Sequence, residues 1–166
     1  MIVDLTQGQC AVIDDTDLLL VEGRSWYAHR IVMKSGIRWY AETEINGKTL
    51  LMHRRLLGLG QSDPDVDHVD GDGLNNRRGN LRLATRSQNC ANADGHPTRR
   101  KSKYKGVRWR SDTRYRAAGY WLAILGIDGR RVQRTARTEL EAAQIYNELA
   151  SQHFGEYARM NALEIT

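Results

Sequence analysis

The sequence predicts an α+β fold built from small antiparallel sheets and a few short helices. Several short segments alternate apolar and polar residues, the pattern of half-buried strands. Two turn dipeptides, Asn46-Gly47 and Asp128-Gly129, favour two-residue β-hairpins. Two capping-box patterns begin at Thr85 and Thr138 and mark the starts of helices. At 166 residues, the chain is long enough for one or two small domains.

The first half of the chain divides into a β-rich N-terminal region, residues 1–50, and a central region, residues 51–94. Strands are predicted over 10–13, 26–33 and 37–45, and a strand end leads into a short helix over 49–59. Residues 61–79 are rich in Asp, Gly and Asn, as in a long polar loop, and such loops are usually functional. A strand over 81–84 follows, and Thr85 caps a helix that begins near Arg86.

Residues 95–102 have the composition of a basic linker, and residues 103–166 form the predicted C-terminal domain. Strands are predicted over 104–110, 119–127 and 130–137, followed by a helix from Thr138 that Gly155 ends. The helix carries acidic residues and one apolar face, whereas the strands carry arginines. We therefore expect a three-stranded antiparallel sheet packed on one helix, with the other face of the sheet as a binding surface.

Positive charge is concentrated in one part of the sequence. The net charge is +5 and the pI is near 9.4, but residues 97–137 alone hold 13 basic and 2 acidic residues. Such a local field is typical of a protein that binds a polyanion, and nucleic acid is the first candidate. A solvated basic face or a disordered linker is the alternative.

Membrane and secreted classes are not expected. The longest apolar run, 18–21, is far shorter than the roughly 18 residues of a membrane span, and the N-terminus lacks a basic signal region. Cys10 and Cys90 are widely separated and form no C-x-x-C pair, which argues against a disulfide framework or a thiolate zinc site. We expect a cytoplasmic protein with no membrane partner and no small-molecule cofactor.

A polar constellation in the central region suits metal-assisted cleavage of phosphodiester bonds. Asp67-His68 at a strand end, Asn80 at the start of an opposing strand and Asn89 in a first helical turn are expected to converge. Histidine can act as a general base at neutral pH when a partner fixes its ring. A carboxylate with an amide oxygen suits a hard divalent cation such as Mg²⁺, which would neutralise charge on the phosphate.

Residues 66–85, continuing to Asn89, resemble the HNH motif of phage-type homing endonucleases, in a variant with Asn at the third position. That family has a ββα-metal fold, here over roughly residues 50–93. The resemblance implies that His68 is the general base, that Asp67 and Asn89 ligate Mg²⁺, Mn²⁺ or another divalent cation, and that Asn80 holds the imidazole of His68. For a phage-encoded protein, the bacterial host cell is the expected location.

Other interpretations of this region stay open. The four residues could be ordinary loop, turn and cap groups; a calcium loop starting at Asp63 would need Gly in place of His68; and a zinc site with His53, His68 and Cys90 has no supporting spacing. Arginines near the motif could clamp DNA phosphates or be solvated: Arg77, Arg78, Arg82 and Arg86.

Residues 104–110, 121–123 and 154–161 resemble the DNA-binding domain of plant ethylene-response factors, the APETALA type. In that family a three-stranded sheet lies in the major groove. The first turn, 111–118, is longer than usual, and 134–137 lacks the usual Leu-Gly. The resemblance implies DNA contacts from Arg108, Arg110 and Trp121, with weaker candidates on the third strand: Arg130, Arg131 and Arg134.

These observations together predict a metal-dependent, homing-type endonuclease that acts on double-stranded DNA as a monomer. Whether it nicks or cuts both strands stays open, as does the target sequence. A non-cleaving DNA-binding regulator and an RNA-binding or RNA-cleaving protein are the alternatives.

Overall fold

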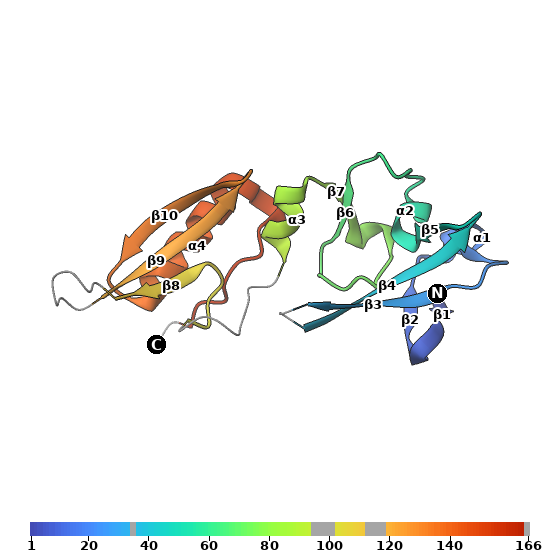
Figure 1. The fold of residues 1–166 in the computed structure, drawn as a ribbon, viewed down its shortest axis with the longest axis horizontal. Helices are drawn as coiled ribbons and strands as arrows, with labels where there is room; N and C mark the ends of the chain where they lie inside the picture. Colours follow the sequence, from blue (N-terminus) through green and yellow to red (C-terminus); the bar gives the residue numbers. More distant parts are fainter. Residues whose placement is uncertain (34–35, 94–101, 112–118, 165–166) are drawn as a thin grey trace. The chain divides into compact units, whose positions relative to one another are not determined.

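The computed structural model describes residues 1–33, 36–93, 102–111 and 119–164. Its mixed α and β content, with several small antiparallel sheets, agrees with the predicted α+β class. The chain forms two compact units, Met1–Thr85 and Arg86–Thr166 (Figure 1). Of the predicted linker 95–102, only Ser102 is among the described residues.

The N-terminal unit contains a two-stranded and a three-stranded antiparallel sheet. The first pairs β1 (Ile2–Asp4) with β2 (Cys10–Val12). The second has the order β3 (Tyr27–Met33), β4 (Gly36–Ile45), β5 (Lys48–Leu51). The predicted Asn46-Gly47 turn joins β4 to β5, and both of its residues have positive φ, as such turns require.

Two short helices complete the frame of this unit. Helix α1 (Leu18–Val21) was not predicted, because four residues are too few to show a helical period. Helix α2 (Met52–Leu56) follows β5 directly, as the sequence indicated, and Gly58 ends it at φ 69°. Apolar side chains from both sheets and both helices form one buried cluster: Ala11, Ile13, Val21, Trp26, Ala41, Met52, Leu56 and Leu74.

The central motif is a second hairpin of the same unit. Strand β6 (Asp65–His68) pairs antiparallel with β7 (Leu81–Ala84), in the register Asp65↔Ala84 to His68↔Leu81. Strand β7 has the predicted bounds. Strand β6 lies within the segment predicted as a loop, because its aspartates disfavour a strand locally; pairing with β7 overrides that preference.

The C-terminal unit is a three-stranded sheet with a helix on one face (Figure 1). The sheet has the order β10 (Arg130–Ala136), β9 (Tyr120–Ile127), β8 (Val107–Arg110), and helix α4 (Glu139–Phe154) packs against it. The predicted cap is present: the Thr138 hydroxyl accepts a hydrogen bond from the Glu141 amide at 3.1 Å. This architecture confirms the predicted sheet and covering helix.

Helix α3 (Arg86–Asn92) begins where the capping pattern indicated, but it belongs to the C-terminal unit. Its Ala91 is buried with Tyr146 and Phe154 of α4, and the Ala91 carbonyl accepts hydrogen bonds from the Arg159 amide and from Lys105 Nζ. Cys10 and Cys90 are both free. In the described part of the chain, no helix is long and apolar enough to cross a membrane.

Candidate active site

His68 is the last residue of β6 and lies in a buried cluster of three rings. Its side chain has only 5% of its surface exposed. The His53 ring of α2 meets it edge to face, with centroids 5.1 Å apart, and the Tyr40 ring of β4 does so at 6.0 Å. The two rings come from different elements of the N-terminal unit and restrict the tilt of the imidazole.

Asn76 fixes which nitrogen of His68 carries the proton. The Asn76 amide nitrogen donates to the Leu74 carbonyl at 3.1 Å, so its amide oxygen is the atom that faces His68 Nε2, at 3.5 Å. An oxygen accepts only from a protonated nitrogen, so this contact favours the tautomer with the hydrogen on Nε2. The neutral ring then has Nδ1 as its basic nitrogen, the atom that a general base uses.

Burial keeps both histidines of the cluster neutral. It lowers the pKa of His68, although the Asn76 contact and the nearby aspartates oppose the shift. For His53, burial and the positive charge that His68 and Arg54 would present lower the pKa to about 3. Nδ1 of His53 is buried with no hydrogen-bond partner among the described residues. A base that is neutral at pH 7 is ready to accept a proton.

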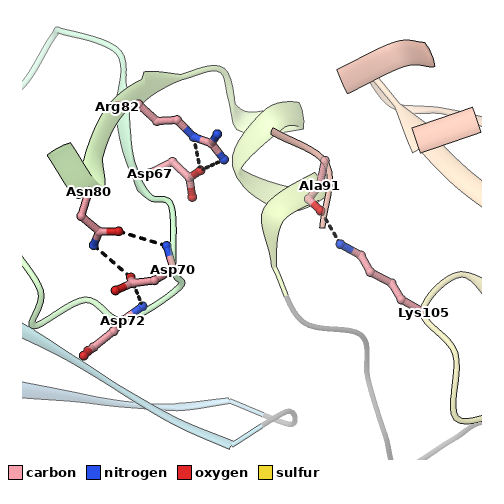
Figure 2. A network of polar contacts seen from close by, with 7 residues as sticks. All are labelled: Asp67, Asp70, Asp72, Asn80, Arg82, Ala91 and Lys105. Carbon is pink, nitrogen blue, oxygen red and sulfur yellow. Dashed lines mark hydrogen bonds and ion pairs between the residues drawn. The ribbon is translucent and has the colours of Figure 1, made fainter. Parts of the chain in front are cut away.

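Asn80 braces the loop between β6 and β7 (Figure 2). Its amide oxygen accepts from the Asp70 backbone at 3.1 Å, and its nitrogen donates to Asp70 Oδ1 at 2.9 Å and to the Asn75 carbonyl at 2.8 Å. The predicted contact with the His68 imidazole is therefore corrected: Asn76 makes it instead. Because both N–H groups of Asn80 are used within the loop, its part is to hold the loop closed.

Asp67 pairs with Arg82 across the two strands (Figure 2). Oδ2 of Asp67 accepts from Nε and Nη2 of Arg82, at 2.9 and 2.7 Å, and the Arg82 side chain is 14% exposed. The guanidinium fixes the orientation of the buried carboxylate. Arg82 thus has a structural partner, and its predicted DNA contact stays a prediction.

The N-terminal sheets hold the same loop from the other side. The backbone N–H of Val12, in β2, donates to the Leu74 carbonyl at 2.9 Å. The Val12 carbonyl accepts from the backbone N–H of Asn76 at 2.7 Å. Gly73 lies so close to β4 that a β-carbon there would collide with the Trp39 carbonyl and the Tyr40 ring. The β-rich region, to which the sequence assigned no chemistry, thus positions the loop that orients His68.

Arg78 joins the end of this loop to the N-terminal region. Its Nε and Nη2 donate to the buried carboxylate of Asp17 at 2.8–3.0 Å, and its backbone amide donates to Asp14 at 2.8 Å. The Arg78 side chain is 48% exposed beside Asp17, and its predicted phosphate contact stays a prediction. Arg77 is also exposed.

Asn89 lies on α3, in the C-terminal unit, and is half-buried. Its predicted part as a second metal ligand stays a prediction. Among the residues that the structure describes, no three His, Cys, Asp or Glu side chains cluster as a metal site. The two predicted ligands, Asp67 and Asn89, are oxygen donors, a type that Mg²⁺ accepts while water completes its coordination shell.

The predicted DNA-contacting arginines of the C-terminal sheet lie on both of its faces. Residues paired across strands share a face. Val107 pairs with the buried Ala123, on the helix side, so Arg108 and Arg110 point to the open side. By the register of β9 and β10, Arg131 shares the open face, whereas Arg130 and Arg134 share the helix side. All five are exposed.

Trp121 packs in the interior and not on the open face. It contacts the buried cluster under α4, and its ring meets that of Trp109 edge to face, with centroids 5.2 Å apart. The predicted DNA contact of Trp121 is therefore corrected. Alternation along β9 places it on the same side as Ala123, which α4 covers.

Sequence reasoning missed three residues of the site: Tyr40, Asn76 and the buried partner Asp17. Asn76 is fully buried although it lies in a loop, where residues are usually exposed. In the sequence, the consecutive Asn75-Asn76 pair was the signal that one of the two side chains could point inward. Tyr40 gave no signal, because it lies in an ordinary strand pattern.

Comparison with known proteins points to one family. Residues 60–91, which contain Asp67, His68, Asn76, Asn80 and Asn89, match the family model described as HNH endonuclease. The chain is also 41% identical over 103 residues to an uncharacterized HNH endonuclease of Acanthamoeba polyphaga mimivirus. That match covers 62% of this chain and half of the length of the relative. No solved structure matches the chain. The chain is therefore similar to HNH endonucleases, with the candidate site inside the segment that matches the family model.

Proposed function

We propose that the chain is a metal-dependent, homing-type HNH endonuclease that hydrolyses phosphodiester bonds of double-stranded DNA. The observation that carries the proposal is the buried, neutral His68 beside Asp67, with its tautomer set by Asn76. These residues lie inside the segment that matches the HNH endonuclease model. Strands β6 and β7 and helix α3 also follow one another in the order of a ββα-metal core.

His68 is the general base in this proposal. Its Nδ1 takes a proton from the attacking water, and Nε2–H stays directed at the Asn76 oxygen. The imidazolium that forms is stabilised by the three aspartates that already favour its charged state: Asp67, Asp70 and Asp72. The water attacks phosphorus, the bond to the leaving 3′ oxygen breaks, and a 5′-phosphate remains on the other fragment.

Asp67 and Asn89 would hold the divalent cation, Mg²⁺ or Mn²⁺. A carboxylate and an amide oxygen are hard donors of the type that such an ion prefers, and Arg82 holds the buried Asp67 carboxylate in one orientation. The cation supplies positive charge to the phosphate and to the leaving oxygen.

The C-terminal sheet supplies sequence preference in this proposal. Arg108, Arg110 and Arg131 share its open face, and a sheet of this type, similar to that of the ethylene-response factors, enters the major groove. Arginine reads guanine through two parallel hydrogen bonds. With one catalytic histidine per chain, a monomer nicks one strand, and paired or sequential nicks give a double-strand break.

The test is incubation of the full chain with supercoiled plasmid and with genomic DNA. We expect conversion to open-circle or linear products in Mg²⁺ or Mn²⁺, none in EDTA, and 5′-phosphate ends. Structured RNA in the same reaction should stay intact. Metal-independent products, or cleavage of RNA in place of DNA, would refute the proposal.

A non-cleaving DNA-binding regulator is the second candidate, and the exposed arginines of the C-terminal sheet favour it. Binding alone needs neither a neutral buried histidine nor a fixed tautomer. If the protein shifts duplex DNA on a gel in a salt-sensitive manner and cuts neither substrate with any divalent metal, this second function replaces the first.

A further inference from the structure

The outer part of the β3–β4 hairpin is exposed on both faces. It consists of residues 30–33 of β3 and 36–38 of β4, referred to below as the hairpin arm. In the N-terminal unit it extends beyond the β6–β7 hairpin and its loop (Figure 1). Four of its apolar side chains are unusually exposed for a strand pair, between 39% and 69% of their surface: Ile31, Val32, Met33 and Ile37.

The hairpin arm carries positive charge and no negative charge among its described residues. Arg30 and Arg38 are its two ionic side chains, and neither makes a hydrogen bond or ion pair with another described residue. Three acidic groups elsewhere in this unit are engaged with other side chains or backbone: Asp14 and Asp17 with Arg78, and Glu42 with His29. Among the described residues of the unit, the two guanidinium groups therefore have no hydrogen-bond or ion-pair partner.

The strand register places one arginine on each face. Ile31 pairs with Arg38 and His29 with Tyr40, so Arg38 lies on the same face as Tyr40, whose ring contacts His68. Arg30 pairs with Trp39 and shares the opposite face with Val32 and Ile37. Arg38 is two residues along β4 from Tyr40, about 7 Å away along the strand.

We propose that the hairpin arm is a DNA-contact element that lies in the major groove beside the cleavage site. This inference rests on the proposed function and adds a contact surface outside the HNH motif and the C-terminal sheet. The major groove is about 12 Å wide and admits a two-stranded ribbon. Arg30 and Arg38 contact phosphates, and the exposed Val32 and Ile37 contact thymine methyl groups.

Charge favours DNA over a second copy of the chain as the occupant. A dimer that paired two hairpin arms would bring like-charged arginines together, and the core of a stable protein interface is depleted in charge. A duplex instead offers phosphates for both arginines and apolar methyl groups between them. Along β4 the arm begins about 7 Å from Tyr40 and ends about 10–13 Å from it, so it reaches to roughly three or four base pairs from the position of Tyr40.

The test compares DNA binding by two double variants of the full chain at several salt concentrations. Arg30→Ala/Arg38→Ala removes both charges of the arm. Arg24→Ala/Lys48→Ala removes two exposed charges away from the arm in the same unit and is the matched control. We expect the slope of log K against log[salt] to fall by about 1.8 for the arm variant only. Footprinting should show loss of protection over three or four base pairs on one side of the cut.

The variant Arg30→Lys/Arg38→Lys shows whether a change in binding comes from lost charge or from altered folding. It keeps the charges and should therefore keep the salt slope of the wild type. Equal slopes for the arm variant and its control would overturn the inference while DNA binding itself, and the proposed function, stand. Dimerisation of the wild type in light scattering that Val32→Ser/Ile37→Ser abolishes, with the salt slope unchanged, would overturn it in favour of a second copy. Absence of DNA binding by the wild type would refute the proposed function as well.

Discussion

The amide oxygen of Asn76, a fully buried residue, faces Nε2 of His68 at 3.5 Å, and the remaining bonds of Asn76 run to the loop and to β2. One residue therefore connects β2, through its backbone, to the candidate catalytic base, through its side chain. Any movement of β2 relative to the loop would change the direction in which His68 points.

Replacing Asn76 with Ala should lower the cleavage rate more than DNA affinity. The imidazole would lose the acceptor that selects its tautomer, and a misplacement of about 1 Å at a reacting group costs about 100-fold in rate. Single-turnover cleavage at saturating protein measures the rate, and a gel shift measures affinity. A variant that cuts at the wild-type rate would show that Asn76 does not orient His68.

Arg78→Ala should change the stability of the protein, whereas Arg77→Ala should change its DNA binding. Without Arg78 the buried Asp17 carboxylate loses its partner, and we expect a loss of about 2–3 kcal/mol in the free energy of unfolding. Arg77 is exposed, so its removal should leave stability unchanged and reduce the salt slope of DNA binding by about 0.9. Urea unfolding and salt titrations measure both. A reduced salt slope without destabilisation in Arg78→Ala would show instead that Arg78 contacts a phosphate.

Acid should destabilise the N-terminal unit through His53. Its pKa of about 3 in the folded protein lies below the ordinary value of 6.5, so below pH 6.5 the unfolded chain binds a proton that the folded chain does not. Stability is therefore full above pH 6.5 and falls as the pH drops toward 3. The slope approaches about 1.4 kcal/mol per pH unit, or about 2 kcal/mol lost by pH 5.

Hydrogen exchange of this unit at pH 8 and pH 5 can measure the effect of His53. The variant His53→Gln should lose most of the pH dependence, whereas His29→Gln, at a histidine that is 47% exposed, should keep it. Equal pH dependence in the two variants would mean that another group is responsible.

Trp121→Ala should destabilise the C-terminal unit without a specific loss of DNA contacts. Its ring packs on Trp109 and on the cluster beneath α4, so truncation should cost about 2–3 kcal/mol. Trp121→Phe, which keeps most of the packing, should bind DNA as the wild type does. Weaker binding by a fully stable Trp121→Phe would place the indole at the DNA.

Local patterns predicted those elements whose signals lie within a few residues. The cap at Thr138, the Asp128-Gly129 turn and the bounds of β7 were all predicted from adjacent residues. Strand β6 was not, since its aspartates have poor strand propensity and only pairing with β7 makes them extended.

The site was predictable in its types of residue and less so in its contacts. His68 and Asp67 lie together at the end of β6 as expected. The sequence predicted Asn80 as the partner of the imidazole, but Asn76 is the residue that contacts it. Sequence spacing cannot show which of two loop amides turns inward. The ion pairs of Arg82 and Arg78 could not be predicted, because Asp67 is on another strand and Asp17 is 61 residues away.

The most direct measurement of the central claim is the cleavage rate of His68→Ala beside His29→Ala, in Mg²⁺ and at equal DNA occupancy. Loss of a general base costs about 10²- to 10⁴-fold, so we expect His68→Ala to cut at least 100-fold more slowly with unchanged affinity, and His29→Ala to cut as the wild type does. Cleavage by His68→Ala at the wild-type rate would contradict the assignment of His68 as the catalytic base.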